Sequence, residues 1–132
     1  SHNTTSHPLY KSILAGEARG IFSGIIRIEK DAQEVSAQQM NKNLLLSNKA
    51  HANSRPQLEI YADDVKCCHG STTGELRPEE LFYFEARGIE KDKARKILAQ
   101  AFSFDVTLKI KNVFIRTYMQ SLLKSKQKMD LL

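Results

Sequence analysis

The sequence predicts a mainly β protein with a helical appendage, and two observations carry this prediction. Extended segments that alternate apolar and polar residues recur every ~10 to 20 residues as far as residue 70, without a helical pattern between them. After Gly74 the apolar residues change to the spacing of helices. The strand spacing fits a sandwich, a barrel or a β-solenoid, because periodicity does not distinguish these architectures.

The composition is that of an ordinary folded protein. Of the 132 residues, 41% are hydrophobic and 27% are charged, and the longest obvious apolar run, Leu44–Leu46, is too short to cross a membrane. The net charge is +5, but the basic residues are scattered apart from Lys124, Lys126 and Lys128. Those three are interpreted as a solvated helix face or a frayed tail, and no nucleic-acid site and no membrane contact are predicted.

The first predicted strands lie between residues 10 and 28. Tyr10–Leu14 reads as a short strand, and Gly20–Ile28 has the strongest strand pattern in this half of the chain. Apolar residues occur on both of its faces, for example Ile26 on one and Ile25 on the other. We therefore expect this strand to be covered on both sides.

The next extended segments are Val35–Met40 and Asn41–Leu46. The polar stretch Asn48–Pro56 is predicted to be a connector, in which His51 is an exposed loop histidine without a second ligand nearby. The small residues of Gly70–Gly74 are predicted to form a turn that ends the β half.

The segments Leu58–Ala62 and Val65–His69 contain the candidate ligands. In an extended segment Cys67 and His69 share one face, ~7 Å apart along the strand, and Cys68 points to the other face. A thiolate and an imidazole can bind the same metal, but two ligands are too few for a closed structural site. The alternative is that both residues only pack. Two adjacent cysteines without others in the chain favour a reducing, cytoplasmic compartment.

Three helices are predicted after Gly74. The first begins near Pro78 and ends before Gly88, the second runs from about Glu90 to Phe104, and the third from about Lys111 to Lys126. The two longer helices each carry an apolar stripe, which is typical of a core. The stripes are Ala94, Ile97, Leu98, Ala101 and Phe102 in the second helix, and Val113, Phe114, Thr117, Tyr118, Ser121 and Leu122 in the third.

No catalytic motif accompanies these elements. The sequence lacks a G-x-S-x-G elbow, a phosphate-binding loop with its lysine and an H-E-x-x-H pair. A metal-dependent enzyme would need ligands beyond Cys67 and His69, and no obvious set is present. We therefore predict that the chain is not an enzyme.

A string of motifs resembles a known family. The string consists of Asn43–Ser47 (NLLLS), Ala50, Arg55-Pro56, Leu58–Gly70 (LEIYADDVKCCHG), Thr73-Gly74 and Leu81–Ile89 (LFYFEARGI). It is similar to the C-terminal part of the SufB/SufD family, the scaffold proteins of the SUF system for iron–sulfur cluster assembly. The resemblance runs from about Leu9 to Phe104. It favours SufD, whose sequences carry a Cys-x-His-Gly run where Cys67, His69 and Gly70 stand.

The resemblance implies a fold and a site. Residues 1–76 would be the last rungs of a right-handed parallel β-helix, and residues 77–132 a small helical C-terminal domain. Cys67 and His69 would hold a transient iron–sulfur cluster in the complex, shared with a partner subunit, and no cofactor would be bound tightly by this chain alone. Cys68 stands where a small residue such as serine is expected, so its role stays open.

The resemblance also implies partners. A SufC-type ATPase would dock on the helices between Glu79 and Phe102, and a SufB-type subunit would pair with the edge of the β-helix. Uncovered strand edges favour self-association, so we expect the isolated chain to form a two-fold homodimer. The alternative function is a purely structural interaction module without a metal or cluster.

Overall fold

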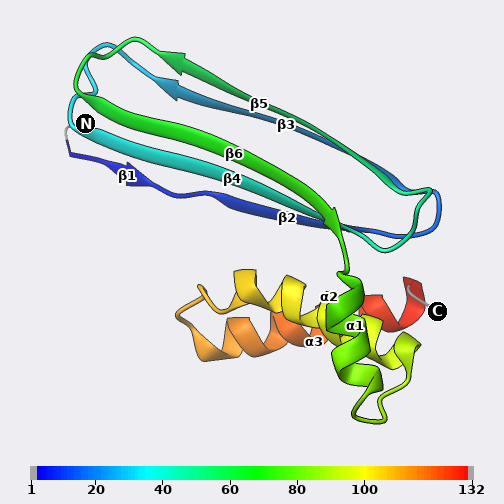
Figure 1. Ribbon diagram of the computed structural model, residues 1–132. Coiled ribbons are helices and arrows are strands. Elements are labelled where there is room, and N and C mark those ends of the chain that lie inside the picture. Colours follow the sequence, from blue (N-terminus) through cyan, green and yellow to red (C-terminus); the bar gives the residue numbers. More distant parts are fainter. Residues whose placement is uncertain (1–2, 131–132) are drawn as a thin grey trace.

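A computed structural model describes residues 3–130 of the chain, and its side chains as far as residue 126. Within that range strands are followed by helices (Figure 1). The strands are β1 (Thr5–Ser6), β2 (Leu9–Leu14), β3 (Arg19–Ile28), β4 (Val35–Leu45), β5 (His51–Ile60) and β6 (Val65–Glu75). The helices are α1 (Pro78–Glu85), α2 (Lys91–Thr107) and α3 (Val113–Asp130). The prediction of a mainly β chain with a helical appendage is confirmed.

The strands form two parallel sheets, which appear as separate layers in Figure 1. In the larger sheet β4 lies between β6 on one side and β1 and β2 on the other, and in the smaller sheet β3 pairs with β5. The chain alternates between the sheets from β2 to β6, so the polypeptide winds around a shared interior. Because β5 and β6 each pair on one side only within the described residues, both are edge strands.

Apolar side chains fill the interior at one end of the strands. Ile28, Ala37 and Ala62 are almost completely buried there, and Val65 and Cys67 pack against them. This end of β3, β4 and β6 therefore holds the hydrophobic core that joins the two sheets.

Polar side chains fill the next part of the interior. Asn41 is only 1% exposed, and its Oδ1 accepts hydrogen bonds from Asn43 Nδ2 at 2.7 Å, Ser54 Oγ at 2.7 Å and Ser71 Oγ at 3.3 Å. Ser54 lies on β5 and Ser71 on β6, so one amide joins three strands across both sheets. A buried polar network of this kind fixes the register of the strands, because a shifted strand would leave its groups unpaired.

The helices lie on the outer side of the larger sheet, where α2 contacts β2 (Figure 1). Lys11 of β2 reaches α2, where its Nζ donates to the Phe102 carbonyl at 2.9 Å and to Asp105 Oδ2 at 2.6 Å. A second link runs from the Arg95 guanidinium to the Leu46 carbonyl. Among the described residues, no helix combines the length and apolar character needed to pass through a bilayer.

The first helix follows its sequence signals. Pro78 occupies the first turn together with Glu79 and Glu80, whose charges suit the positive end of the helix dipole. Gly88, with φ +75°, follows the end of the helix in the left-handed conformation that glycine tolerates best. The predicted position of this helix is confirmed.

The two strand boundaries predicted around the polar stretches are wrong. Asn48–Pro56 is not a connector, since residues from His51 onward belong to β5, and Gly70–Gly74 is part of β6. Small polar side chains fit in these parts of β5 and β6 because Ser54 and Ser71 hydrogen-bond to Asn41 in a polar interior. Pro56 has no backbone N–H to donate. It is compatible with β5 because an edge strand needs hydrogen-bond donors toward one neighbouring strand only.

Two predictions of burial are also wrong. The outer face of β3 is not covered, because the helices lie on the larger sheet, and Ile21 is 79% exposed. The α3 stripe is exposed as well, with Phe114 at 87% and Tyr118 at 64%, because α3 contacts α2 through another side, where Gln120 Nε2 donates to Thr107 Oγ1 at 3.0 Å.

The α2 stripe is correct only in part. Ala94 is fully buried and Ile97, Leu98 and Phe102 are half-buried, but Ala101 is exposed and Ala99 takes a buried position instead. On α3 the side chains of Lys124 and Lys126 are exposed, whereas the side chain of Lys128 lies outside the described part.

Candidate functional site

The edge strand β6 carries both predicted ligands. Cys67 lies beside Ala37 of β4, and His69 lies beside Gln39. Ala37 and Gln39 are both buried, and neighbouring residues in register share a face of the sheet, so Cys67 and His69 face the interior side of the larger sheet. The two side chains therefore lie on the same face of one strand.

The two residues differ in exposure. Cys67 is half-buried and packs against the core of Ile28, Ala37 and Ala62, whereas His69 is exposed. The reason is the position of β6, which begins a new turn of the chain beyond β5, the last strand of the smaller sheet within the described residues. Because His69 lies in this edge strand and is exposed, its imidazole is accessible from outside the chain.

The chain alone does not complete a metal site. Cys67 and Cys68 are both free thiols, and Cys68 is exposed on the opposite face of β6. Within the described residues no three or more side chains of His, Cys, Asp and Glu gather in a way that could hold a metal ion. An iron ion bound between Cys67 and His69 would need ligands from another molecule.

A buried amide beside His69 was missed in the sequence. Gln39 is 3% exposed, and its Oε1 has no hydrogen-bond partner among the described residues. The other end of the amide approaches Gly24 of β3, where a Cβ atom would lie 2.0 Å from Gln39 Nε2. The available signal was the alternation of Gln39, Asn41 and Asn43, which puts three amides on the inward face of one strand.

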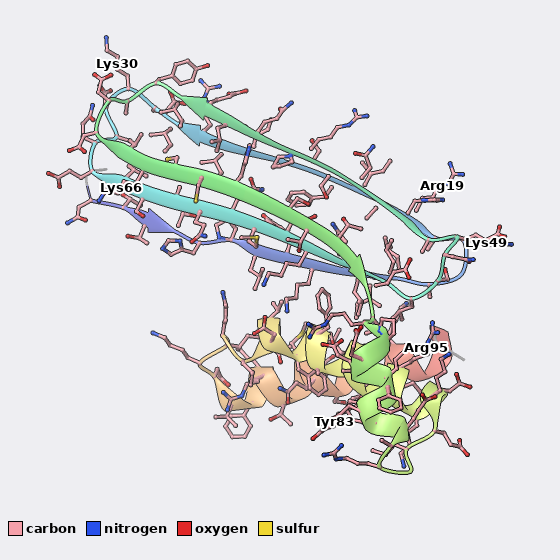
Figure 2. The ribbon with its side chains drawn as sticks, in the orientation of Figure 1. Arg19, Lys30, Lys49, Lys66, Tyr83 and Arg95 are labelled. Atoms are coloured by element: carbon pink, nitrogen blue, oxygen red, sulfur yellow. The ribbon has the colours of Figure 1, made fainter. Side chains whose placement is uncertain are left out.

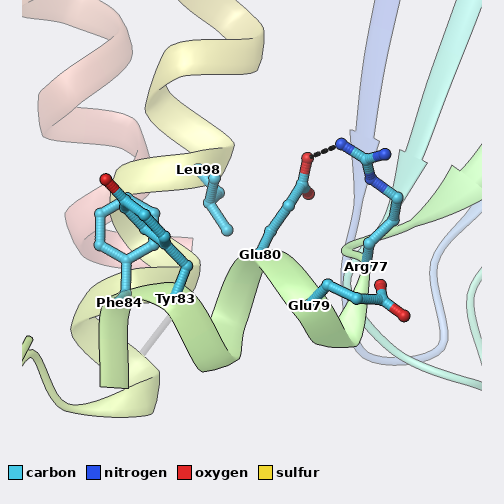
Figure 3. Close-up of a pocket in the computed structure, with 6 residues that line it drawn as sticks. All are labelled: Arg77, Glu79, Glu80, Tyr83, Phe84 and Leu98. Atoms are coloured by element: carbon cyan, nitrogen blue, oxygen red, sulfur yellow. Dashed lines mark hydrogen bonds and ion pairs between the residues drawn. The ribbon is translucent and has the colours of Figure 1, made fainter. Parts of the chain in front are cut away.

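A second candidate site lies between α1 and α2 (Figure 3). This open pocket has a volume of about 300 Å³, and Figure 3 shows its wall of aromatic and aliphatic side chains beside a charged rim. Its lining residues are Arg77, Glu79, Glu80, Tyr83, Phe84 and Leu98. The hydrogen bond from Arg77 and its positive charge lower the pKa of Glu80, so the rim carries an ion pair between these two residues. All of its lining residues except Arg77 belong to the stretch from Glu79 to Phe102, which was predicted to contact a partner.

His51, the other histidine whose position was predicted, lies away from Cys67 and His69. His51 is exposed as predicted, but it is the first residue of β5 and not part of a loop. It lies beside Arg19 of β3, at the opposite end of that strand from the Cys67 core.

Comparison with known proteins gives one family. Residues 1–102 match the family described as SUF system FeS cluster assembly, SufBD core domain. The chain is 40% identical over 102 residues to the iron–sulfur cluster assembly protein SufD of Escherichia coli, covering 77% of this chain and 24% of that protein. It is 42% identical over 105 residues to a SufBD family protein of Synechocystis, covering 80% and 23%.

A third relative extends the match into α3. The chain is 31% identical over 120 residues to the iron–sulfur cluster assembly protein SufD of Bacillus subtilis, covering 91% of this chain and 28% of that protein. The chain therefore spans about a quarter of the length of the relatives it matches.

Proposed function

Because the chain belongs to the SufB/SufD family of the SUF iron–sulfur cluster assembly system, on the SufD side, we propose that it acts as a SufD-like scaffold. In this role it pairs with a SufB-type subunit and docks a SufC-type ATPase. The observation that carries the proposal is the run from Cys67 to Gly70 on an edge strand whose interior face is open at His69.

The proposed architecture is a right-handed parallel β-helix in residues 1–76 with a helical domain in residues 77–132. The regular winding of the chain supports this architecture. Ser47 contacts Gly16, 31 positions earlier, and Lys49 contacts Glu17, 32 positions earlier, so the two contacts join successive turns at nearly the same spacing. The change from strand to helix between Glu75, where β6 ends, and Pro78, where α1 begins, supports this proposed division.

The proposed site for the cluster is the pair Cys67 and His69, completed by the SufB-type subunit. The cluster is cargo in this account, so the pair holds it transiently and no tightly bound cofactor is needed. Iron binds cysteine as the thiolate and histidine as the neutral ring, so each residue must release its proton for the cluster to form. The open side at His69 gives the partner subunit room to supply the remaining ligands.

The proposed ATPase contact lies on the helices between Glu79 and Phe102. The pocket beside α1 and the exposed side chains of Glu85 and Lys93 support this choice. The ATPase supplies the chemical energy, so this chain needs no catalytic residues and is not an enzyme. The reducing compartment expected for Cys67 and Cys68 is the cytoplasm.

The strand edges are the proposed pairing surface. β5 and β6 each leave one row of backbone groups unpaired within the described residues, and such edges recruit further strands. In the complex the partner is the SufB-type subunit, and in its absence a second copy of this chain pairs there as a two-fold dimer.

One observation favours the alternative function. Cys67 packs against the core, which is what a purely structural interaction module without a cluster requires. The two functions are separated by co-purification of the chain with SufB-type and SufC-type subunits, scored for complex formation and for bound iron. A complex that assembles with iron supports the scaffold, and a complex that assembles without iron supports the structural module.

A further inference from the structure

The outer face of the smaller sheet is an uncovered surface with its own chemistry. Side chains alternate along β3 and β5, and those on the outer face include Ile21 and Ile25, which are 79% and 56% exposed. The helices lie on the larger sheet and leave this face open (Figure 1).

Charge is distributed unevenly along this face. At one end the Arg27 guanidinium lies 2.7 Å from Glu29 Oε1 and 3.9 Å from Glu59 Oε2, so its charge is neutralised. At the other end Arg19 has no acidic partner among the described residues, and neither has Arg55 in the middle of β5. The nearby Lys49 is already paired, with Glu17 at 2.7 Å.

A pocket lies at the unneutralised end. Its volume is about 430 Å³. It is lined by the cross-strand pairs Arg19 and His51, Gly20 and Ala52, and Ile21 and Asn53. Figure 2 shows the Arg19 side chain at this end of β3, directed away from the larger sheet. The side chains of Arg19 and His51 are exposed and make no hydrogen bond or ion pair with the rest of the described chain.

We propose that this pocket binds a small phosphorylated molecule, with the phosphate between Arg19, His51 and Asn53. A guanidinium donates two parallel hydrogen bonds to a phosphate, and the imidazole and amide N–H groups add further donors beside it. Ile21 provides an apolar wall against which the non-phosphate part of the ligand packs. The volume suits a ligand of metabolite size.

The pocket is independent of the proposed cluster site. Arg19 begins β3, whereas the core that contacts Cys67 contains Ile28 at the end of the same strand. The strand therefore separates the two sites by its full length, and a loss of phosphate binding would leave the Cys67 and His69 assignment untouched.

Calorimetric titration of the 132-residue chain with inorganic phosphate and with phenyl phosphate tests the proposal. Both probes should bind to one site per chain, phenyl phosphate more tightly because its ring reaches Ile21. Arg19→Gln should weaken the binding of both by about tenfold or more, since it removes a charge-assisted pair of hydrogen bonds. His51→Ala is the second variant and should weaken both by a smaller factor.

Arg27→Gln is the matched control, because it removes an arginine from the same face of the same strand. It should change the binding of either probe by less than about twofold, since Glu29 and Glu59 already neutralise that charge. The proposal is overturned if neither probe binds, or if Arg27→Gln weakens binding as much as Arg19→Gln does.

Discussion

Lys11 Nζ lies 2.6 Å from Asp105 Oδ2, and this contact joins the second strand to the second helix. The Lys11 side chain is only 8% exposed, and the same ammonium donates to the Phe102 carbonyl and lies 4.4 Å from the centre of the Phe102 ring. One buried lysine thus connects the sheet to the helical part through an ion pair, a hydrogen bond and a cation–π contact.

We predict that Lys11→Met destabilises the chain. Methionine keeps the apolar stem but removes all three contacts of the ammonium, so the free energy of unfolding should fall by about 1–3 kcal/mol. Urea denaturation followed by circular dichroism measures the change. Lys49→Met is the control, because its ion pair with Glu17 is exposed on both sides and should contribute less than about 1 kcal/mol. Equal effects of the two variants would contradict the account.

The same pair predicts a dependence on pH. The hydrogen bond from Lys11 and its charge lower the pKa of Asp105 below its usual value of 3.8. The stabilisation is therefore fully present above the pKa of the unfolded chain, and it is lost as the pH falls through the lower pKa of the folded chain. The difference in unfolding free energy between the wild type and Asp105→Asn should shrink below about pH 4. A difference that stays constant between pH 7 and pH 3 would refute this prediction.

Gly24 is predicted to be essential for packing. A Cβ atom at this position would lie 2.0 Å from Gln39 Nε2 and 2.8 Å from Phe22 Cζ, so Gly24→Ala should cost about 1–3 kcal/mol. Gly74→Ala is the matched control, since nothing lies within 4 Å of a Cβ atom there. Thermal unfolding of both variants decides the point, and a Gly24→Ala variant as stable as Gly74→Ala would show that the interior is looser than described.

Phe114 is predicted to contribute little to folding. It is 87% exposed on α3, so Phe114→Ser should change the unfolding free energy by less than about 0.5 kcal/mol. Leu98→Ser is the comparison, because that half-buried residue of α2 also lines the pocket beside α1 and should cost clearly more. If Phe114→Ser were the more damaging variant, the original interpretation of its stripe as core would be correct.

These cases show what the sequence could and could not predict. The position of α1 could be predicted because it depends on nearby residues, with Pro78 in its first turn and Gly88 just after its end. Alternation in Val65–His69 correctly placed Cys67 and His69 on one strand. Which face of an apolar stripe is covered depends on distant elements, so Phe114 was assigned to the core.

The burial of polar side chains in the interior could not be predicted from the sequence either. Asn41 is buried because Ser54 and Ser71, from two other strands, donate to its side chain. The polar residues after Asn48 and after Gly70 therefore read as loops until those partners are known. The contact between Lys11 and Asp105 could not be predicted either, because the two residues are 94 positions apart and meet only in the folded chain.

The central claim is that Cys67 and His69 hold a cluster together with a SufB-type subunit. Iron and acid-labile sulfide in the purified complex with SufB-type and SufC-type subunits test it most directly, for the variants His69→Ala, Cys67→Ser and Cys68→Ser. His69→Ala and Cys67→Ser should lose most of the cluster. Subunit pairing of the His69→Ala chain should stay near the wild type, because His69 is exposed. Cys68→Ser should lose much less, since its side chain lies on the opposite face. Wild-type iron and sulfide in the His69→Ala complex would contradict the account and leave the purely structural function.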